Sequence, residues 1–375
     1  MAGLLLAGPA GAMSLMPDGY HVFLGDDIQD AVERAAVNPT NKTVRVHAGE
    51  YRPAAQQQAL VWLNRRHDGV LLEAIGPVTL NAANPALGLP SQPGYPAAVN
   101  HLVYFGSGIS TNTVLQGFRL TGANGFLTKT NTGLIEPDRT IRKNLFFYSD
   151  GGAIKVFGKS SPTLRDLVIE DNFTSPCGAG ISIQQEGHKQ TAVLIENCIF
   201  TNNRAQGTGS ALELLPGSAA RLSNCLFVRN ISNMGEDPVA KASGERPFVN
   251  NGAVTIFWKS HAEFRNCTFA GNRNGVDDMG GASSYVNCLF ADNTLEAGLK
   301  GHPRYELAVN AGATAKGCVF TGKIIDGQQK VSATDNLLSA PPPRFDTDFV
   351  PAAPEYADAG YRPIAKAKPA AGNQP

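Results

Sequence analysis

A short motif, Asn-Cys-x-Phe, recurs along the middle of this chain and constrains the fold more than any other feature. Copies begin at Asn197, Asn224, Asn266 and Asn287, with a degenerate copy at Gly317 and looser ones at Gly117, Asn144 and Asp166. The spacing is irregular, about two dozen residues with one longer step, which is typical of stacked coils that carry loops of different length. The repeat therefore predicts a solenoid rather than a globular domain.

Each repeat also contains a second stretch in which apolar and polar residues alternate. These stretches follow small residues and lie at 152–156, 178–183, 210–214, 252–256 and 305–309. Alternation with a period of two indicates a strand with one buried face. Stacked coils would place equivalent residues about 4.8 Å apart, so each position becomes a ladder. We therefore expect an all-β, single-stranded parallel β-helix.

The cysteines and asparagines are ladder residues in this scheme. Five of the six cysteines share one repeat position, and each is followed two residues later by an aromatic residue. We interpret them as a column of small buried hydrophobes, with a disulfide framework as the alternative. They lack the Cys-x-x-Cys spacing of a metal site. The asparagines give two ladders, one at the first motif position (Asn197 and its equivalents) and one formed by Asn172, Asn203, Asn230, Asn272 and Asn293.

Composition excludes two classes of function. Lys+Arg and Asp+Glu are both 32, so the net charge is zero and no basic surface for nucleic acid is expected. No apolar run is long enough for a membrane-spanning helix. Residues 1–24 are an apolar leader without an early Lys or Arg, either a signal segment or a disordered start. We expect a secreted, periplasmic or cell-surface protein.

The ends of the solenoid need caps over the open core. Residues 26–36 predict an amphipathic N-terminal capping helix. The β-helix is expected over 25–322, a proline-rich C-terminal capping segment over 323–365, and a disordered tail over 366–375. Two long loops, 123–142 and 231–250, are either solvated loops or walls of a groove.

The capping helix, the strand Thr43–Tyr51 and the Asn-Cys-x-Phe coils together resemble the pectin-lyase-like superfamily of right-handed parallel β-helix proteins. The resemblance covers about residues 25–322. It implies a right-handed β-helix and a polysaccharide ligand, most often acidic, along the outer face. Export is expected because this fold is commonest in exported proteins. No cofactor and no metal site are predicted, with a calcium ion as the open alternative, for which Glu213, Asp277 and Asp278 would be the cation ligands. Fold-level resemblance alone does not determine activity.

Two segments are similar to catalytic motifs of that superfamily but are incomplete. Lys159 lies in a segment similar to one in which a lysine acts as the base of alginate lyases, but the partner arginine is not evident. Asp277 and Asp278 are similar to the paired aspartates of polygalacturonases, without the accompanying His and Arg-x-Lys motifs.

The repeat register predicts which side chains point outward from the second strand of each coil. One outward column is Lys155, Ser182, Glu213, Thr255, Asp277 and Ala308, and its neighbour is Phe157, Gln184, Leu215, Phe257 and Met279. Aromatic rings beside carboxylates are typical of sugar-binding surfaces. Glu213 and Asp277 would lie two rungs apart, within reach of an inverting glycosidase geometry.

Asp278 breaks the local pattern, because neighbouring coils bury Val, Ile or Leu at its position. Either the strand bends and turns Asp278 outward, or its carboxylate is paired inside the core. The candidate catalytic residues are therefore Asp277, Asp278 and Glu213, and the candidate substrate-binding residues are Lys155, Phe157, Phe257 and Arg273.

Two hypotheses follow. The first is an exported polysaccharide lyase or hydrolase that uses these residues. The second is a non-catalytic β-helix that binds a glycan or a protein partner along the solenoid face, as a surface or scaffold component.

Overall fold

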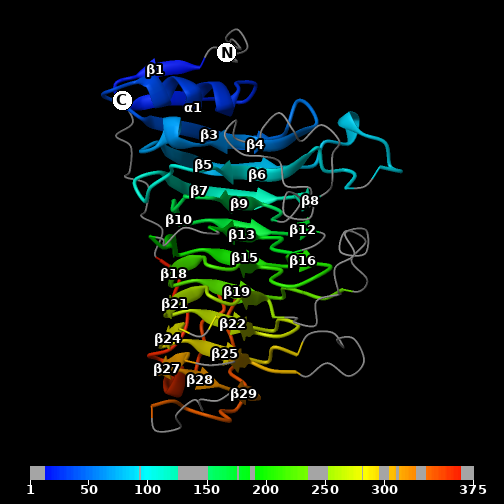
Figure 1. Cartoon of the computed structure of the whole chain (residues 1–375), viewed down its shortest axis with the longest axis vertical. Helices are drawn as coiled ribbons and strands as arrows, with labels where there is room; N and C mark the ends of the chain where they lie inside the picture. The colour runs from blue at the N-terminus through cyan, green and yellow to red at the C-terminus, as the bar shows by residue number, and fades with distance from the viewer. Residues whose placement is uncertain are drawn as a thin grey trace, which may run out of the picture.

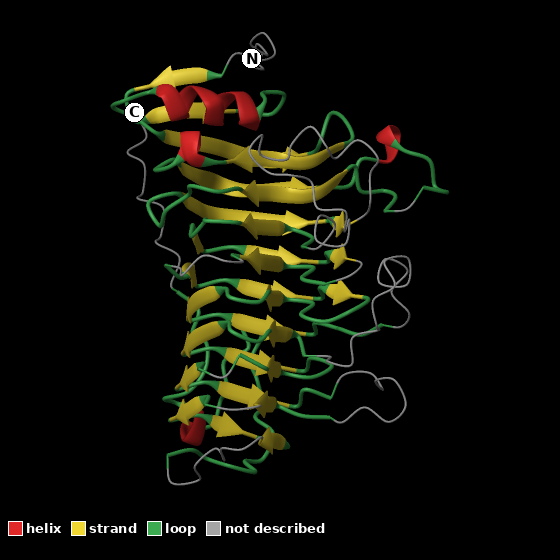
Figure 2. Cartoon of the chain, viewed as in Figure 1, coloured by secondary structure: helices red, strands yellow, loops and turns green. Residues whose placement is uncertain are grey.

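The protein is one elongated solenoid of stacked parallel strands (Figures 1 and 2). The computed structural model describes residues 13–92, 94–125, 151–174, 177–185, 191–234, 252–280, 282–294, 304–309, 312–326 and 335–364. The predicted loops 123–142 and 231–250 and the predicted tail 366–375 lie largely or wholly outside these residues. Within them, no helix is long and apolar enough to cross a membrane.

Three sheets run along the solenoid, and every strand pairing except that of β1 with β2 is parallel. Sheet A contains β1 (Ser14–Met16), β2 (Gly19–Val22), β3 (Thr43–Tyr51), β5 (Leu71–Asn81), β7 (Val114–Thr121), β10 (Thr163–Arg165), β11 (Val168–Glu170), β14 (Val193–Glu196), β15 (Ile199–Thr201), β18 (Ala219–Ser223), β19 (Leu226–Val228), β21 (His261–Arg265), β22 (Thr268–Ala270), β24 (Ser284–Val286), β25 (Leu289–Ala291), β27 (Thr314–Lys316) and β28 (Val319–Phe320). Sheet B contains β4 (Gln57–Leu63), β6 (Val99–Phe105), β9 (Ile154–Phe157), β13 (Ile181–Gln184), β17 (Leu212–Leu214), β20 (Val254–Ile256), β23 (Val276–Asp278), β26 (Leu307–Val309) and β29 (Ile324–Asp326). Sheet C contains β8 (Asn124–Gly125), β12 (Phe173–Thr174) and β16 (Arg204–Ala205). Short 3-10 helices lie at Arg65–His67, Pro85–Leu87 and Pro354–Tyr356.

The Asn-Cys-x-Phe motif forms the corner between two successive strands of sheet A. Its asparagine has a positive φ, for example 55° at Asn197, which asparagine tolerates better than most residues. The phenylalanine two residues after the cysteine points into the core. The rings of Phe200, Phe227, Phe269, Phe290 and Phe320 stack from coil to coil with centroids 4.6–4.8 Å apart. The motif thus supplies both the turn and the centre of the core.

The cysteines are free thiols buried in the core. Cys198, Cys225, Cys267, Cys288 and Cys318 occupy equivalent positions on successive coils, and Cys177 is buried separately. The interpretation as a column of small buried hydrophobes therefore agrees with the structure, and the disulfide alternative does not.

A second column, of asparagines, runs beside the core. The Nδ2 group of each residue donates to the Oδ1 atom of the next, from Asn172 to Asn203, Asn230, Asn272 and Asn293, over 2.7–3.0 Å. Asn293 in turn donates to the buried Glu306, which also accepts from Thr321. Burial raises the pKa of Glu306, although the bonds from Asn293 and Thr321 oppose that rise. Glu306 therefore ends the asparagine column with a carboxyl group.

The N-terminal cap is α1 (Ile28–Val37), with Ile28, Ala31, Val32 and Ala35 buried over the first coil. Asp27 caps the helix by accepting from the Gln29 N–H over 2.8 Å. The expected leader differs from the structure in its second part. Residues 14–22 form β1 and β2, and β2 is buried and pairs with β3. They belong to the solenoid because Tyr20 and Val22 supply apolar contacts to the core.

The C-terminal segment extends beyond the last coil. The solenoid itself continues past residue 322, since β29 pairs with β26. Residues 335–340 stack on β28 as a further rung. The following residues, up to 364, return along the outer side of sheet A, where the main chain of Arg362 exchanges two hydrogen bonds of 2.7 Å with Asn224. Tyr361 packs there on Leu226 and Val228. The red trace beside β18 to β28 in Figure 1 follows this path.

Candidate functional site

The candidate site lies on the outward-facing side of sheet B. The strand register aligns one residue per coil into a column, as the sequence predicts: Lys155, Ser182, Glu213, Thr255, Asp277 and Ala308. The structure adds Tyr104 to the same column. We call Lys155, Ser182, Glu213, Thr255 and Asp277 the polar column. Glu213 and Asp277 are separated by one intervening rung, so their backbones lie about 10 Å apart.

The expectation that this column forms an exposed surface is wrong. Lys155 and Glu213 are each only 1% exposed, and Asp277 is 7% exposed. Part of the cover comes from the turns that precede each strand. Gly178 has a φ of 72°, and a β-carbon there would lie 2.8 Å from the Ser182 Cβ atom and 3.2 Å from Glu213 Oε2. Glycine therefore lets the main chain lie directly against the polar column, which the alternation of residues alone does not reveal.

Hydrogen bonds link successive members of the polar column. Lys155 Nζ donates to Ser182 Oγ over 3.0 Å, and Ser182 Oγ donates to Glu213 Oε2 over 3.4 Å. Thr255 shares a short hydrogen bond with Thr208. One buried cation and one buried carboxylate are thus joined through a serine, an arrangement that lowers the cost of burying both charges.

Asp277 is the unusual member of the column. Burial, and then the neighbouring Asp278 charge, raise its pKa to about 7 from an ordinary value of 3.8. Its Oδ2 atom is buried and has no hydrogen-bond partner among the described residues. A carboxyl group with these properties can hold a proton near neutral pH and deliver it to a ligand.

Asp278 faces the core rather than the ligand side. It aligns with Ile256 and Val309 in the register of sheet B. Its Oδ2 atom accepts from the hydroxyl of the buried Tyr285 over 3.0 Å, and its Oδ1 atom accepts from the Gly280 N–H. Of the two outcomes left open by the sequence, the paired carboxylate is the one observed. The Asp278 side chain therefore faces the core, on the opposite side of sheet B from the side chains of Asp277 and Glu213.

The neighbouring column carries the aromatic residues. Phe157 is half-buried and Phe257 is 4% exposed, and Phe157 lies opposite Gln184 in the register. The Phe157 ring lies 6.3 Å from that of Tyr104. Phe257 contacts Trp258, a residue that is 55% exposed. Trp258, which the sequence analysis did not single out, is thus the aromatic residue here that solvent reaches most readily.

The remaining candidates lie apart from the polar column. Arg273 is buried, and its Nη1 atom donates to the carbonyl groups of Ser232 and Asn233 over 2.7 and 2.5 Å. This pairing braces the chain that follows β19. Lys159 is exposed on the turn after β9. Within the described residues, no group of three or more His, Cys, Asp or Glu is arranged to hold a metal ion.

The N-terminal part of the outward face was missed by the repeat analysis. Strands β4 and β6 extend sheet B, and Trp62 pairs with Tyr104 at the start of the same column. The sequence signal was the apolar run at residues 59–63, which carries no Asn-Cys-x-Phe motif. Trp62 lines a cavity of about 680 Å³ beside α1.

Comparisons with known proteins agree with the fold. Residues 106–243 match the family model described as the right-handed β-helix region. The crystal structure of pectate lyase Pel9A is similar at 10% identity and a TM-score of 0.37, over 76% of this chain and 71% of that one. A likeness at this level carries no activity across. No curated protein matches the chain. The resemblance noted in the sequence is confirmed at the level of the fold: the chain is a right-handed parallel β-helix.

Proposed function

We propose that the protein acts on a polysaccharide outside the cytoplasm, as a glycoside hydrolase whose acid and base are Asp277 and Glu213. The observation that carries this proposal is the buried Asp277 carboxyl, whose Oδ2 atom has no partner among the described residues and whose pKa is raised to about 7. A general acid needs this property, since it must remain protonated at the working pH.

Glu213 supplies the complementary group. Ser182 donates to its Oε2 atom, and Lys155 bonds Ser182 in turn, so the column holds a cation near this carboxylate. The separation of about two rungs suits an inverting mechanism, in which a water molecule lies between base and sugar. Asp277 would protonate the leaving oxygen while Glu213 deprotonates that water.

Aromatic side chains beside the column support a sugar ligand. Phe157 is half-buried and Trp258 is exposed, so their rings offer apolar faces to pyranose rings. The resemblance of the fold to polysaccharide-degrading enzymes supports the same substrate class, as an analogy.

The second candidate function is binding without turnover. The observation that favours it is the burial of Lys155 and Glu213, whose charged groups are bonded within the column rather than presented to solvent. A glycan would then contact the aromatic residues and not reach Glu213.

The test is a turnover screen of the purified protein on acidic and neutral polysaccharides, with calcium or with a chelator. Reducing ends report hydrolysis, and absorbance of unsaturated products reports a lyase. Asp277→Asn and Glu213→Gln should each abolish release of reducing ends, while Lys159→Ala should not change it. Turnover that survives both carboxyl variants overturns the acid–base assignment. Glycan binding without turnover on any substrate supports the second candidate.

A further inference from the structure

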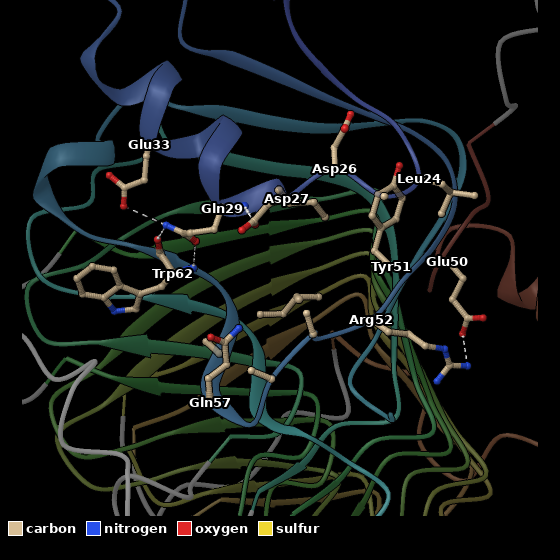
Figure 3. Close-up of a pocket in the computed structure, with 16 residues that line it drawn as sticks. Leu24, Asp26, Asp27, Gln29, Glu33, Glu50, Tyr51, Arg52, Gln57 and Trp62 are labelled. Atoms are coloured by element: carbon tan, nitrogen blue, oxygen red, sulfur yellow. Dashed lines mark hydrogen bonds and ion pairs between the residues drawn. The ribbon is translucent and has the colours of Figure 1, made fainter. Parts of the chain in front are cut away.

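A cavity at the N-terminal end of the solenoid lies outside the proposed active site. It has a volume of about 680 Å³ and is bounded by the start of α1, the end of β3 and strand β4. Figure 3 shows Gln29, Trp62 and Gln57 on one side of it and Tyr51 and Arg52 on the other. Volumes of this size are typical of ligand sites.

One wall of this cavity is an open sheet edge. In sheet B, β4 is the terminal strand and pairs only with β6. The Gln57 N–H bonds Ala98 on the β6 side, and the Leu63 carbonyl accepts from Gly106 on that same side. Main-chain groups alternate in direction along a strand, so those of Leu60 and Trp62 point the other way. They point toward the cavity.

Gln29 occupies part of this edge in the manner of a neighbouring strand. Its Nε2 atom donates to the Trp62 carbonyl over 3.0 Å, and its Oε1 atom accepts from the Trp62 N–H over 2.7 Å. No described residue does the same for Leu60, whose N–H and C=O remain open toward the cavity. An unpaired edge of this kind is a template for another strand.

The charge around the opening is negative. Glu33 and Glu50 line the cavity but are paired with Arg66 and Arg52, at 3.2 and 2.9 Å. Asp26 and Asp27 also line it, and no described cation pairs with either. The indole of Trp62 adds an aromatic face, which attracts cations.

We infer that this cavity binds an extended peptide with lysine or arginine side chains, which adds a strand to the free edge of β4. The peptide main chain would bond the Leu60 N–H and C=O groups, and one basic side chain would lie between Trp62 and the Asp26–Asp27 pair. Strand addition supplies affinity through main-chain bonds, and the side-chain pocket supplies selectivity.

The binding test uses fluorescence anisotropy of a short labelled peptide of alternating valine and lysine, with the full chain. A matched peptide carries glutamate in place of lysine. Two further peptides carry N-methyl groups on alternate sets of main-chain amides. The lysine peptide should bind, the glutamate peptide should bind at least about tenfold more weakly, and one N-methylated set should lose binding while the other retains it.

Matched variants locate the site. Leu60→Pro removes the Leu60 N–H, which points to the cavity and which Gln29 does not bond, and leaves the bonds to β6; proline is tolerated on strand edges. Leu60→Val keeps that N–H. Only the proline variant should lose the peptide, with circular dichroism and the melting temperature checking that both fold. In a Trp258→Phe background, Trp62 is the remaining tryptophan, so its emission should shift on binding.

Three results of the peptide titrations, and one of the variants, would overturn the inference. In the titrations they are the absence of lysine-peptide binding at about 1 mM, equal affinity for the glutamate peptide, and equal loss for the two N-methylated sets. If a folded Leu60→Pro protein binds like Leu60→Val, the peptide does not use this edge. None of these results depends on polysaccharide turnover, so the inference and the proposed function fail independently.

Discussion

Tyr285 donates a hydrogen bond of 3.0 Å to Asp278 inside the core of the solenoid. Both side chains are buried, and Tyr285 also stacks on Phe264 with ring centroids 5.1 Å apart. Burial and the Asp278 charge together raise the pKa of Tyr285, so the hydroxyl stays a donor throughout the accessible pH range. The bond explains how a carboxyl group occupies a rung where other coils bury aliphatic residues.

Tyr285→Phe should destabilise the protein by about 2 kcal/mol, because it leaves a buried Asp278 oxygen without a donor. Urea denaturation at neutral pH would measure this loss. The double variant Tyr285→Phe/Asp278→Val removes both polar partners and should recover most of the stability. A double variant as unstable as the single one would contradict this explanation.

Asp277→Asn should stabilise the protein at neutral pH and above. The folded-state pKa of Asp277 is about 7, against an ordinary value of 3.8. The folded state therefore binds a proton more tightly than the unfolded chain. Its contribution to stability is complete below pH 3.8 and is lost as the pH rises through 7, by up to about 4 kcal/mol.

The measurement is the free energy of unfolding of wild type and Asp277→Asn between pH 4 and 8. The advantage of the asparagine variant should grow with pH over this window. Glu355→Gln, which changes an exposed carboxylate, is the control and should show no such trend. A constant difference between wild type and Asp277→Asn would contradict the raised pKa.

If Asp277 is the general acid, turnover should fall as the pH rises above about 7, because the carboxyl loses the proton that it must deliver. The pH dependence of kcat/KM on the substrate found in the screen would show this alkaline limb. Asp277→Asn should show no turnover at any pH in the range. An alkaline limb that lies far above 7 would assign the acid to another group.

Asn230→Ala should cost about 4 kcal/mol, because it removes several buried hydrogen bonds at once. The Asn230 Oδ1 atom accepts from both the N–H and the Nδ2 group of Asn203, and its Nδ2 atom donates to the Phe200 carbonyl and to Asn272. Truncation leaves several buried polar groups unpaired at once. Thermal and urea unfolding would measure the effect.

Asn266→Gly provides the comparison, because Asn266 is exposed and its φ of 53° suits glycine. It should change stability by less than about 1 kcal/mol. Similar losses in the two variants would mean that the asparagine column does not act through its hydrogen bonds.

The sequence predicted features that repeat with the coil and missed those that occur once. The corners, the cysteine column and the alignment of Lys155, Glu213 and Asp277 follow from a motif seen several times. Strands β1, β2, β4 and β6 lack that motif and were assigned to a leader or not recognised. The burial of the outward column depends on main-chain turns at glycines such as Gly178, whose packing no alternation pattern encodes.

The partner of Asp278 illustrates the same limit. The sequence showed that its rung was irregular, but not that Tyr285, seven residues later on β24, would reach it across the core. Such a contact depends on how two sheets face each other. Similarly, the cavity beside α1 arises where the helix replaces a strand, and no local pattern marks it.

Because the polar column takes one residue from each coil, the spacing of its chemical groups comes in whole steps. Glu213 and Asp277 can be moved apart or together along the axis only by adding or removing an entire coil, whereas substitution at Thr255 changes what lies between them without changing the interval. A fold of this kind can therefore change its chemistry by substituting side chains at fixed spacing. It can change the spacing itself only by duplication or deletion of whole repeats.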